Sequence, residues 1–477
     1  MAASRDERPS AKIPAETWTA AHERLVANLV ALIRIPTVNP PDPPGPELAA
    51  ARLIESWLTG AGLEPTVYEP VPGRGSVVAR LRGDGTGGEP LLLLSHLDVV
   101  PAPTGRWTHD PFSGAIENGY VYGRGAVDMK DLVAMEVEVM RLLAAETRAM
   151  GRDPARDPVP GLRRDVLLAV TADEEAGGID GVGWLADHHP EHLHAAGALN
   201  ESGAVSIDVG GRRLYPIQVA EKGYAAYVIT VEGAWGHGSM PRPDNAVVLA
   251  ADVVQRLSVP GTPSISPVMR EFFESAAGAL GGEAASVLRA IASGDTARAE
   301  AAIDRLCAPV YARAARALVR DTISPNVVHA GIKYNVIPGE AVIELDCRLL
   351  PETDEPDMRA EIERRLGPEL VAACRIELIA AAPAVVASAD TALYRVLAQA
   401  VRDHDPEGVP IPVMAPFSTD NKTLARIGVP AYGFSPLRLE PDEAYLERFH
   451  GVDERVGLEA LRWGLPVLYD AVRRFCG

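Results

Sequence analysis

The sequence predicts an α/β fold in which a doubly wound mixed sheet is interrupted by a smaller α+β domain. Helix and strand patterns alternate up to about residue 220 and again after about residue 386, whereas the stretch between them has long strands and segregated helices. The chain has 477 residues, more than one hydrophobic core usually supports. We therefore expect one domain in two parts, residues 1–220 and 386–477, and an inserted domain over residues 221–385.

The first part is expected to alternate helices with short buried strands. Leu25, Leu29 and Leu32 recur at helical spacing, and Ile35-Pro36 ends that run. Four consecutive leucines at 91–94 predict a strand that is buried on both faces. Similar patterns predict further helices at 46–58, 132–143 and around 182–186, and further strands at 76–81, 166–170 and 196–199.

The middle segment has a different pattern. Polar and apolar residues alternate in expected strands at 224–231, 341–348 and 375–379, and an alanine-rich helical stretch extends from 271 to 320. Helix and strand patterns alternate again near Asp390, and a helix is expected over 456–475. This return to the first pattern is why we assign both ends of the chain to one domain.

Charge and composition exclude several classes of partner. The 65 acidic and 46 basic residues give a net charge of −19, which repels phosphate backbones and anionic lipid surfaces. No stretch approaches the roughly 20 apolar residues of a membrane span, and the first twelve residues are polar. We therefore expect a soluble, cytoplasmic protein with no nucleic-acid or membrane partner. Unpaired thiols are expected at four widely spaced positions, Cys307, Cys347, Cys374 and Cys476.

Acidic and histidine side chains follow three of the expected strands. Ser95-His96-Leu97-Asp98 comes after residues 91–94, and Asp98 is placed to orient an imidazole that ligates a metal. Thr171-Ala172-Asp173-Glu174-Glu175 and Asn200-Glu201-Ser202 come after the strands at 166–170 and 196–199. Open α/β sheets bind ligands at the carboxyl ends of their strands, and adjacent carboxylates repel unless a cation compensates them.

Two further motifs lie between and beyond these strands. Asp128 stands in G-R-G-A-V-D-M-K before an expected helix, and a late histidine stands in F-H-G-V-D-E. Each alone is explained by a helix cap or a structural histidine. Together the motifs supply two imidazoles and three carboxylates, a set that suits two zinc ions sharing one acid: His96, Asp128, Glu175, Glu201 and His450.

These motifs, in this order, resemble the co-catalytic zinc exopeptidase and aminoacylase family. That family includes glutamate carboxypeptidase, succinyl-diaminopimelate desuccinylase, acetylornithine deacetylase and aminoacylase. The resemblance covers nearly the whole chain and rests on S-H-L-D-V-V-P, G-R-G-x-x-D-M-K, T-A-D-E-E-A-G-G, N-E-S and the late H-x-x-x-E. It implies that residues 1–220 and 386–477 form a catalytic zinc domain and that residues 221–385 form a lid or dimerisation domain.

The resemblance also implies how the metals are held. Asp128 would bridge two ions, of which one also binds His96 and Glu201. The other ion would bind Glu175 and His450. Zinc is the expected metal, with cobalt or manganese as the alternatives.

Catalytic and substrate-binding roles follow from the same resemblance. Asp98 would orient the first metal-ligating imidazole, and Glu174 would act as general base on the water that bridges the metals. His237, in G-H-G-S-M-P, would reach the oxyanion, in many relatives from a partner subunit. Asn335 and Arg348 would bind a substrate carboxylate.

A final substrate-side assignment is Asp420, in S-T-D. The long stretch from residue 263 to 320 exceeds the compact lid of smaller relatives, and it either reshapes the dimer interface or leaves the protein monomeric. Aspartate at 131 replaces the glycine that many relatives have there, at a position with no metal role. A histidine cluster with an i, i+4 pair is interpreted as a solvated helix end: His188, His189, His192 and His194.

The implied function is zinc-dependent hydrolysis of a peptide or N-acyl amide bond next to a free carboxylate. Glutamate at 201 is associated in this family with carboxypeptidases and N-acyl-amino-acid hydrolases, and aspartate there with aminopeptidases and dipeptidases. A broad-specificity dipeptidase is the nearest alternative, and a catalytically silent relative that binds metal or peptide is a remote one. A serine hydrolase built on Ser95 is disfavoured because no G-x-S-x-G surrounds it.

Overall fold

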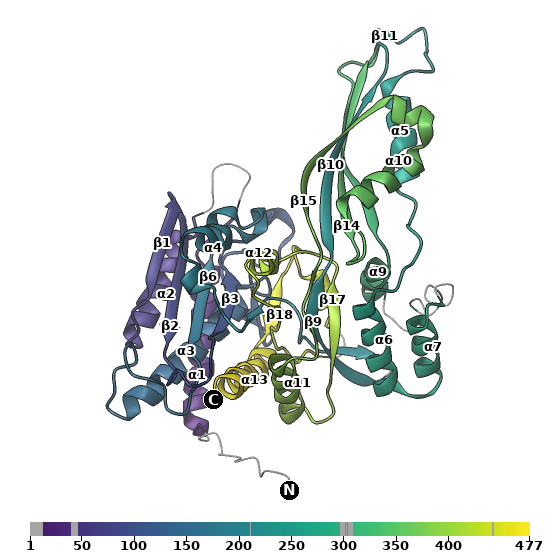
Figure 1. Cartoon of the computed structure of the whole chain (residues 1–477). Coiled ribbons are helices and arrows are strands. Elements are labelled where there is room, and N and C mark those ends of the chain that lie inside the picture. Colours follow the sequence, from purple (N-terminus) through teal and green to yellow (C-terminus); the bar gives the residue numbers. More distant parts are fainter. Residues whose placement is uncertain are drawn as a thin grey trace. The chain divides into compact units, whose positions relative to one another are not determined.

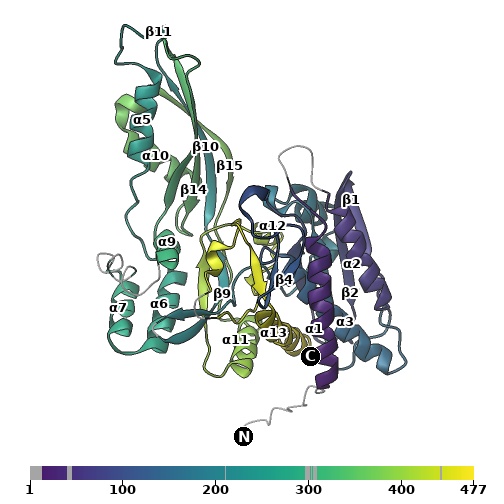
Figure 2. The same ribbon diagram turned by 180° about the vertical axis from the view of Figure 1, so that it is seen from behind.

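The computed structural model describes residues 13–39, 46–209, 211–295, 301, 303, 309–440 and 443–477. The chain divides into two compact units (Figures 1 and 2). Unit 1 comprises 1–217, 388–411 and 423–477, and unit 2 comprises 218–387 and 412–422. No helix in the described part of the chain is long and apolar enough to cross a membrane. Cys347, Cys374 and Cys476 are free thiols, whereas Cys307 lies outside the described residues.

A mixed sheet forms the centre of unit 1. Parallel pairs join β3 to β6, β3 to β7 and β7 to β18, and antiparallel pairs add β2 and then β1 at the edge. The order is β1 (Thr66–Val71), β2 (Arg74–Leu81), β6 (Val166–Thr171), β3 (Leu91–His96), β7 (Gly197–Asn200) and β18 (Ala431–Gly433). Beyond β18 the sheet continues through β9 (Arg212–Glu221), with which β8 (Ile207–Val209), β16 (Val385–Val386) and β17 (Val409–Ala415) pair.

Helices cover both faces of this sheet. Leu92 and Leu94 point to one face, where they pack with Leu185 of α4 (Trp184–His188) and Leu424 of α12 (Asn421–Arg426). The intervening leucines of β3 are also fully buried, as expected for a strand covered on both sides. The other layer consists of α1 (Ala15–Ile33), α2 (Leu48–Gly60), α3 (Lys130–Ala149), α11 (Ala392–His404) and α13 (Leu458–Cys476).

Unit 2 is built on a separate antiparallel sheet. Its strands lie in the order β12 (Thr322–Ala330), β14 (Glu340–Leu349), β10 (Gly223–Glu232) and β15 (Cys374–Ala382). Two helices, α5 (Ala246–Leu257) and α10 (Glu355–Ala372), cover one face and form a core with Tyr227, Ile229 and Ile343. A short pair, β11 (Gly236–His237) and β13 (Val336–Ile337), carries two of the predicted site motifs.

The predicted fold class is confirmed, and the differences are local. Residues 271–320 do not form one helical stretch, because Gly281, with φ of 71°, separates α6 (Pro267–Leu280) from α7 (Gly282–Ala292), and α9 (Pro309–Leu318) follows later. Val456 belongs to β19 (Arg455–Gly457), so the last helix begins at Leu458. This strand forms a small sheet with β5 (Tyr120–Tyr122) and β4 (Ala115–Glu117), which the sequence patterns did not reveal.

Candidate metal centre

The first group of donor atoms gathers at the carboxyl end of β3. His96 is the last residue of that strand and is almost fully buried. Its Nε2 lies 3.3 Å from Oδ1 of Asp128 and 3.9 Å from Oε2 of Glu201. These three residues each offer one donor atom, and the three atoms lie within 4.8 Å of one another. The arrangement brings together three of the five predicted metal ligands.

The second group shares Asp128 with the first. Nε2 of His450 lies 3.2 Å from the other carboxylate oxygen of Asp128 and 3.3 Å from Oε2 of Glu175. These donor atoms also lie within 4.8 Å of one another. The two groups therefore use opposite oxygens of one carboxylate, and all five predicted ligands meet in unit 1.

Asp98 organises this centre chiefly through the backbone. Its carboxylate oxygens accept hydrogen bonds of 3.0 Å from the N–H groups of Glu174 and Glu175, and another of 2.8 Å from Asn39. Nδ1 of His96 lies 3.0 Å from the backbone oxygen of Asp98 and 3.5 Å from its carboxylate. Besides facing the imidazole, the Asp98 carboxylate thus fixes the turn that carries two other site residues.

That turn depends on residues with left-handed backbone. Asp173 has φ of 74°, a conformation that aspartate tolerates better than most residues, and its side chain accepts a 2.9 Å hydrogen bond from the N–H of Asp180. Gly177 and Gly178 also have positive φ, and the N–H of Gly178 closes the turn on the oxygen of Asp173 at 2.7 Å. The A-D-E-E-A-G-G sequence thus folds back sharply and presents Glu174 and Glu175 at the strand end.

The electrostatics of the centre favour cations. Burial opposes a charge on His96, but the carboxylates of Asp128 and Asp98 raise its pKa well above the usual value. Hydrogen bonds to Asp128 and Glu175 raise the pKa of His450 to about 10. Burial raises the pKa of Glu175, whereas the two imidazoles lower that of Asp128 against the effect of burial. The carboxylates thus favour positive charge at two neighbouring points.

The donor set also fits a pair of zinc-class ions. Nε2 of His96 and Oε1 of Glu175 are buried and have no hydrogen-bond partner. Buried polar atoms are normally satisfied, so two such atoms within a cluster of imidazoles and carboxylates are what a metal site requires. Two imidazoles and three carboxylates, one of them shared, match the ligand chemistry of a dinuclear centre.

Buried residues around the donors were missed by the sequence reasoning. Glu454 accepts hydrogen bonds from the N–H groups of Val127 (2.9 Å) and Asp128 (3.3 Å), and it forms a buried 2.6 Å ion pair with Arg124. This arrangement fixes the loop of the shared ligand. Glu454 is the last residue of the late H-x-x-x-E motif, and Arg124 lies in the G-R-G motif. Both motifs are visible in the sequence, but neither of these two residues had an assigned role.

A second buried network lies behind Asp98. The guanidinium of Arg74 contacts Glu47 at 2.8 Å, Asp173 at 3.1 Å and the side-chain oxygen of Asn39 at 2.7 Å. Burial and the nearby Asp98 carboxylate raise the pKa of Glu47 to about 7. These residues lie in ordinary polar sequence and form no motif, so sequence reasoning had no means of finding them.

The predicted substrate-binding residues lie in unit 2. His237 is exposed in β11, and its Nδ1 lies 2.7 Å from Oγ of Ser239. Asn335 immediately precedes β13, the strand that pairs with β11. Asp420 is buried in the loop that follows β17.

The side chain of Arg348 already has a carboxylate partner. Its Nε and Nη2 donate to the two oxygens of Asp346 at 2.6 and 2.9 Å, whereas Nη1 lies 3.5 Å from Oγ of Ser418. The two residues are two positions apart on β14, so both side chains emerge from the same face of the sheet. Only one arm of the guanidinium is therefore turned away from this internal pair.

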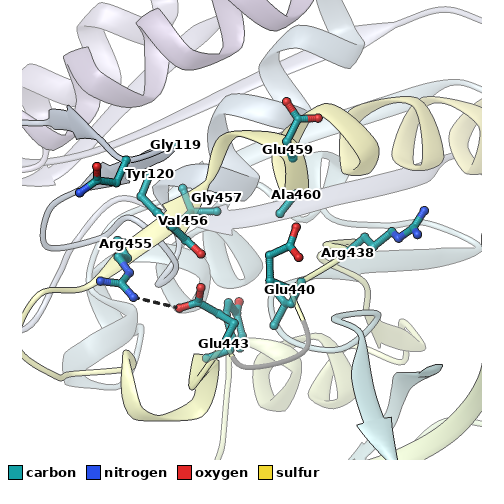
Figure 3. Close-up of a pocket in the computed structure, with 13 residues that line it drawn as sticks. Gly119, Tyr120, Arg438, Glu440, Glu443, Arg455, Val456, Gly457, Glu459 and Ala460 are labelled. Atoms are coloured by element: carbon teal, nitrogen blue, oxygen red, sulfur yellow. Dashed lines mark ion pairs between the residues drawn. The ribbon is translucent and has the colours of Figure 1, made fainter. Parts of the chain in front are cut away.

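A cavity of about 200 Å³ lies elsewhere in unit 1 (Figure 3). Tyr120 and Arg455 from the small sheet line it, together with Glu443, and Nη2 of Arg455 lies 3.7 Å from Oε1 of Glu443. A further lining residue, Tyr445, is buried, and burial together with Asp131 and Asp128 raises its pKa well above the usual value.

Three of the known proteins that this chain resembles illustrate its likenesses. The N-fatty-acyl-amino acid synthase/hydrolase PM20D1 of Mus musculus is 26% identical over 98% of this chain and 91% of its own length. An M20 family metallo-carboxypeptidase from Sulfolobus solfataricus has a TM-score of 0.68 and 16% identity, covering 94% of this chain and 99% of that one. A dinuclear metal binding peptidase of the same family from Bacillus subtilis has a TM-score of 0.57 and 13% identity, covering 96% and 99%.

The family model that matches the chain spans most of its length. Residues 92–474 match Peptidase family M20/M25/M40. The match begins within β3 and ends within α13, so it includes every donor residue of the two groups. The chain belongs to Peptidase family M20/M25/M40 and is a metallohydrolase of that family.

Proposed function

We propose that the protein hydrolyses an amide bond next to a free carboxylate, as a carboxypeptidase or an N-acyl-amino-acid amidohydrolase. The observation that carries this proposal is the pair of donor groups that share Asp128 at the edge of a buried sheet. A shared carboxylate between two groups of ligands suits two-metal hydrolysis. The curated relative named above acts on N-fatty-acyl amino acids, which are substrates of this class.

In this proposal the five donor residues hold two zinc-class ions. His96 and Glu201 would hold one ion, Glu175 and His450 would hold the other, and Asp128 would be shared by both. When bound, the two ions supply Lewis acidity and lower the pKa of a coordinated water. The protein holds the donors in place through the buried backbone contacts of Asp98 and Glu454.

Glu174 is the general base of the proposed reaction. Its carboxylate oxygen lies 4.0 Å from Nε2 of His96, so it faces the donor atoms, and its backbone is fixed by Asp98. It accepts the proton of the attacking water and then donates that proton to the leaving amine. Neighbouring glutamates thereby have different tasks, because Glu175 contacts His450 instead.

Unit 2 would act as the lid. Arg348 and Asn335 would bind the substrate carboxylate, and His237 would donate a hydrogen bond to the oxyanion, within one chain or across a homodimer. Asp420 would border the substrate from the loop after β17. The hydrogen bonds of Arg348 to Asp346 fix the guanidinium, and Nη1, which lies 3.5 Å from Oγ of Ser418, is the nitrogen that this carboxylate does not engage.

The test is hydrolysis of a panel of N-acetyl, N-succinyl and long-chain N-acyl amino acids, dipeptides and the matching C-terminal amides. Each substrate is offered to zinc-loaded and to chelated protein. We expect zinc-dependent cleavage of N-acyl amino acids and no cleavage of the amides. Cleavage restricted to dipeptides would change the assignment to dipeptidase, and inactivity on all substrates with two zinc ions bound would contradict the proposal.

A further inference from the structure

A third group of metal-ligating side chains lies on the surface of unit 1, outside the dinuclear centre. It occupies the tight turn after α4, where His189 directly follows the helix as its C-cap and the 3-10 turn Pro190–His192 comes next. Two leucines that flank the turn in sequence hold it against the core. Leu185 and Leu193 are both fully buried there. The backbone that carries the group is therefore held in place.

The donor atoms of this turn are close together. Nδ1 of His189 lies 3.2 Å from Oε1 of Glu191, and Nε2 of His192 lies 3.9 Å from the same oxygen. All three donor atoms lie within 4.8 Å of one another. A tetrahedral zinc ion with bonds of about 2.0–2.2 Å needs ligands roughly 3.3 Å apart, so small side-chain rotations would complete the geometry.

Aromatic rings fix both imidazoles. Tyr68 of β1 lies against His189 with ring centroids 4.3 Å apart, and its hydroxyl lies 2.9 Å from Nε2 of His192. Trp184 also contacts His189, at 5.3 Å between ring centroids. A site whose ligands are already oriented loses less side-chain freedom when an ion binds, which strengthens binding.

The chemistry of the donors selects the ion. Two imidazoles and one carboxylate suit zinc and its neighbours among the transition metals, whereas calcium and magnesium prefer oxygen ligands. Glu191 supplies the negative charge, and water can complete the coordination.

We propose that His189, Glu191 and His192 form a mononuclear site for a zinc-class transition metal, separate from the dinuclear centre. The spacing of these ligands is i, i+2 and i+3, so the i, i+4 histidine pair considered from sequence is not the relevant one. The turn leads through Leu193 into β7, the strand that ends one residue before Glu201. An ion here would replace the hydrogen bond between Nε2 of His192 and Tyr68, and it would brace the turn that connects α4 to β7, as a structural metal does.

The test is the zinc content of the full-length protein after equilibration in a zinc-buffered solution, for wild type and His189→Ala/His192→Ala. We expect the double variant to hold one equivalent fewer and to keep its hydrolytic activity. The difference in zinc content between the two proteins does not depend on how many ions the dinuclear centre holds, because both proteins contain the same centre. Equal zinc content in the two proteins would overturn the proposal.

Two matched variants sharpen the result. His194→Ala removes a nearby exposed histidine that pairs with Glu89 instead, so it should keep the wild-type zinc content. Tyr68→Phe preserves the ring contact and frees Nε2 of His192, so it should also keep the extra equivalent. Loss of that equivalent in His194→Ala would overturn the assignment of ligands. A rise in melting temperature with zinc that is smaller in the double variant than in wild type would support the structural role.

Discussion

The backbone N–H of Glu174 donates a 3.0 Å hydrogen bond to the carboxylate of Asp98. The proposed base is thus attached to the end of β3 through its main chain. A chemical change of its carboxylate leaves this backbone hydrogen bond in place. This separation makes the general-base role testable with an isosteric variant.

Glu174→Gln should keep both metal ions and lower kcat by about 10²–10⁴-fold, the usual contribution of a general base. The amide has the same shape but cannot accept the proton of the attacking water. Metal content and kcat are measured on the same preparation. Glu64→Gln, at an exposed position, is the control and should be unchanged. Normal turnover in Glu174→Gln would exclude the base assignment.

Arg74 and Arg80, both on β2, form a matched pair for stability. Arg74 is buried between Glu47 and Asp173, so Arg74→Ala should lower the free energy of unfolding by about 3–5 kcal/mol. Arg80 is 48% exposed in its pair with Asp165, so Arg80→Ala should change it by about 0–1 kcal/mol. The free energy of unfolding of both variants is measured by urea denaturation. Equal losses in the two variants would show that the buried ion pairs stabilise the protein no more than the exposed one.

Arg348→Ala should raise KM about 10–100-fold for substrates with a free carboxylate. This is the loss expected when one hydrogen bond to a charged group is removed. It should leave KM for C-terminal amides nearly unchanged. Arg375→Ala is the control, because Arg375 lies on the same sheet and is 54% exposed. The same loss on amides as on acids would argue against carboxylate binding.

Mixing two impaired variants, assayed with a free-carboxylate substrate well below its KM, tests whether the lid acts across a homodimer. If His237 serves the partner's centre and Arg348 serves its own, a mixed dimer of His237→Ala and Arg348→Ala contains one complete site. We then expect activity to recover toward a quarter of wild type in a random mixture of equal amounts. Lack of recovery, with mixed dimers demonstrated by tag co-purification, would indicate a site formed within one chain.

Glu136 of α3 should make stability fall as the pH rises. It is fully buried, and burial raises its pKa to about 8 although Oγ of Ser95 donates a hydrogen bond to it. Between its unfolded value of 4.5 and about 8, the folded state binds more protons than the unfolded state, so stability is lost across this window. Glu136→Gln mimics the protonated form and should remove the effect.

The measurement is the free energy of unfolding at several pH values between 5 and 8. The difference between wild type and Glu136→Gln should change by about 1.4 kcal/mol per pH unit in this range. Glu64→Gln again serves as the exposed control. A difference that stays constant with pH would mean that Glu136 does not change its protonation in the folded protein.

The sequence located the donor residues because each follows a recognisable strand or motif. His96 and Glu201 come directly at or after buried apolar strands, and the carboxyl ends of parallel strands converge. Arg74 and Asn39 could not be found in this way, since their partners are fixed only by the tertiary fold. The ion pair between Arg348 and Asp346 could have been predicted from the sequence, because residues two apart on a strand share a face.

The fold was predictable to the same degree and for similar reasons. Strands buried on both faces, such as β3, have unmistakable sequences, whereas β12 contains Pro325 and is largely exposed, which weakens any strand pattern. The short strand β19 was included in the following helix, because three residues are too few for periodicity to appear. The turn at His189 was judged by helical spacing, which does not apply beyond the end of α4.

Because the two donor groups share Asp128, the order in which their other ligands are synthesised decides when each group can be completed. The Asp128 partners His96 and His450 are separated by most of the sequence, and the second arrives only just before the final helix. The second donor group therefore cannot close until the chain has been made almost to its end. A chain that stopped before residue 450 would lack a ligand of this group and also α13, whose buried residues pack against α3 and α11.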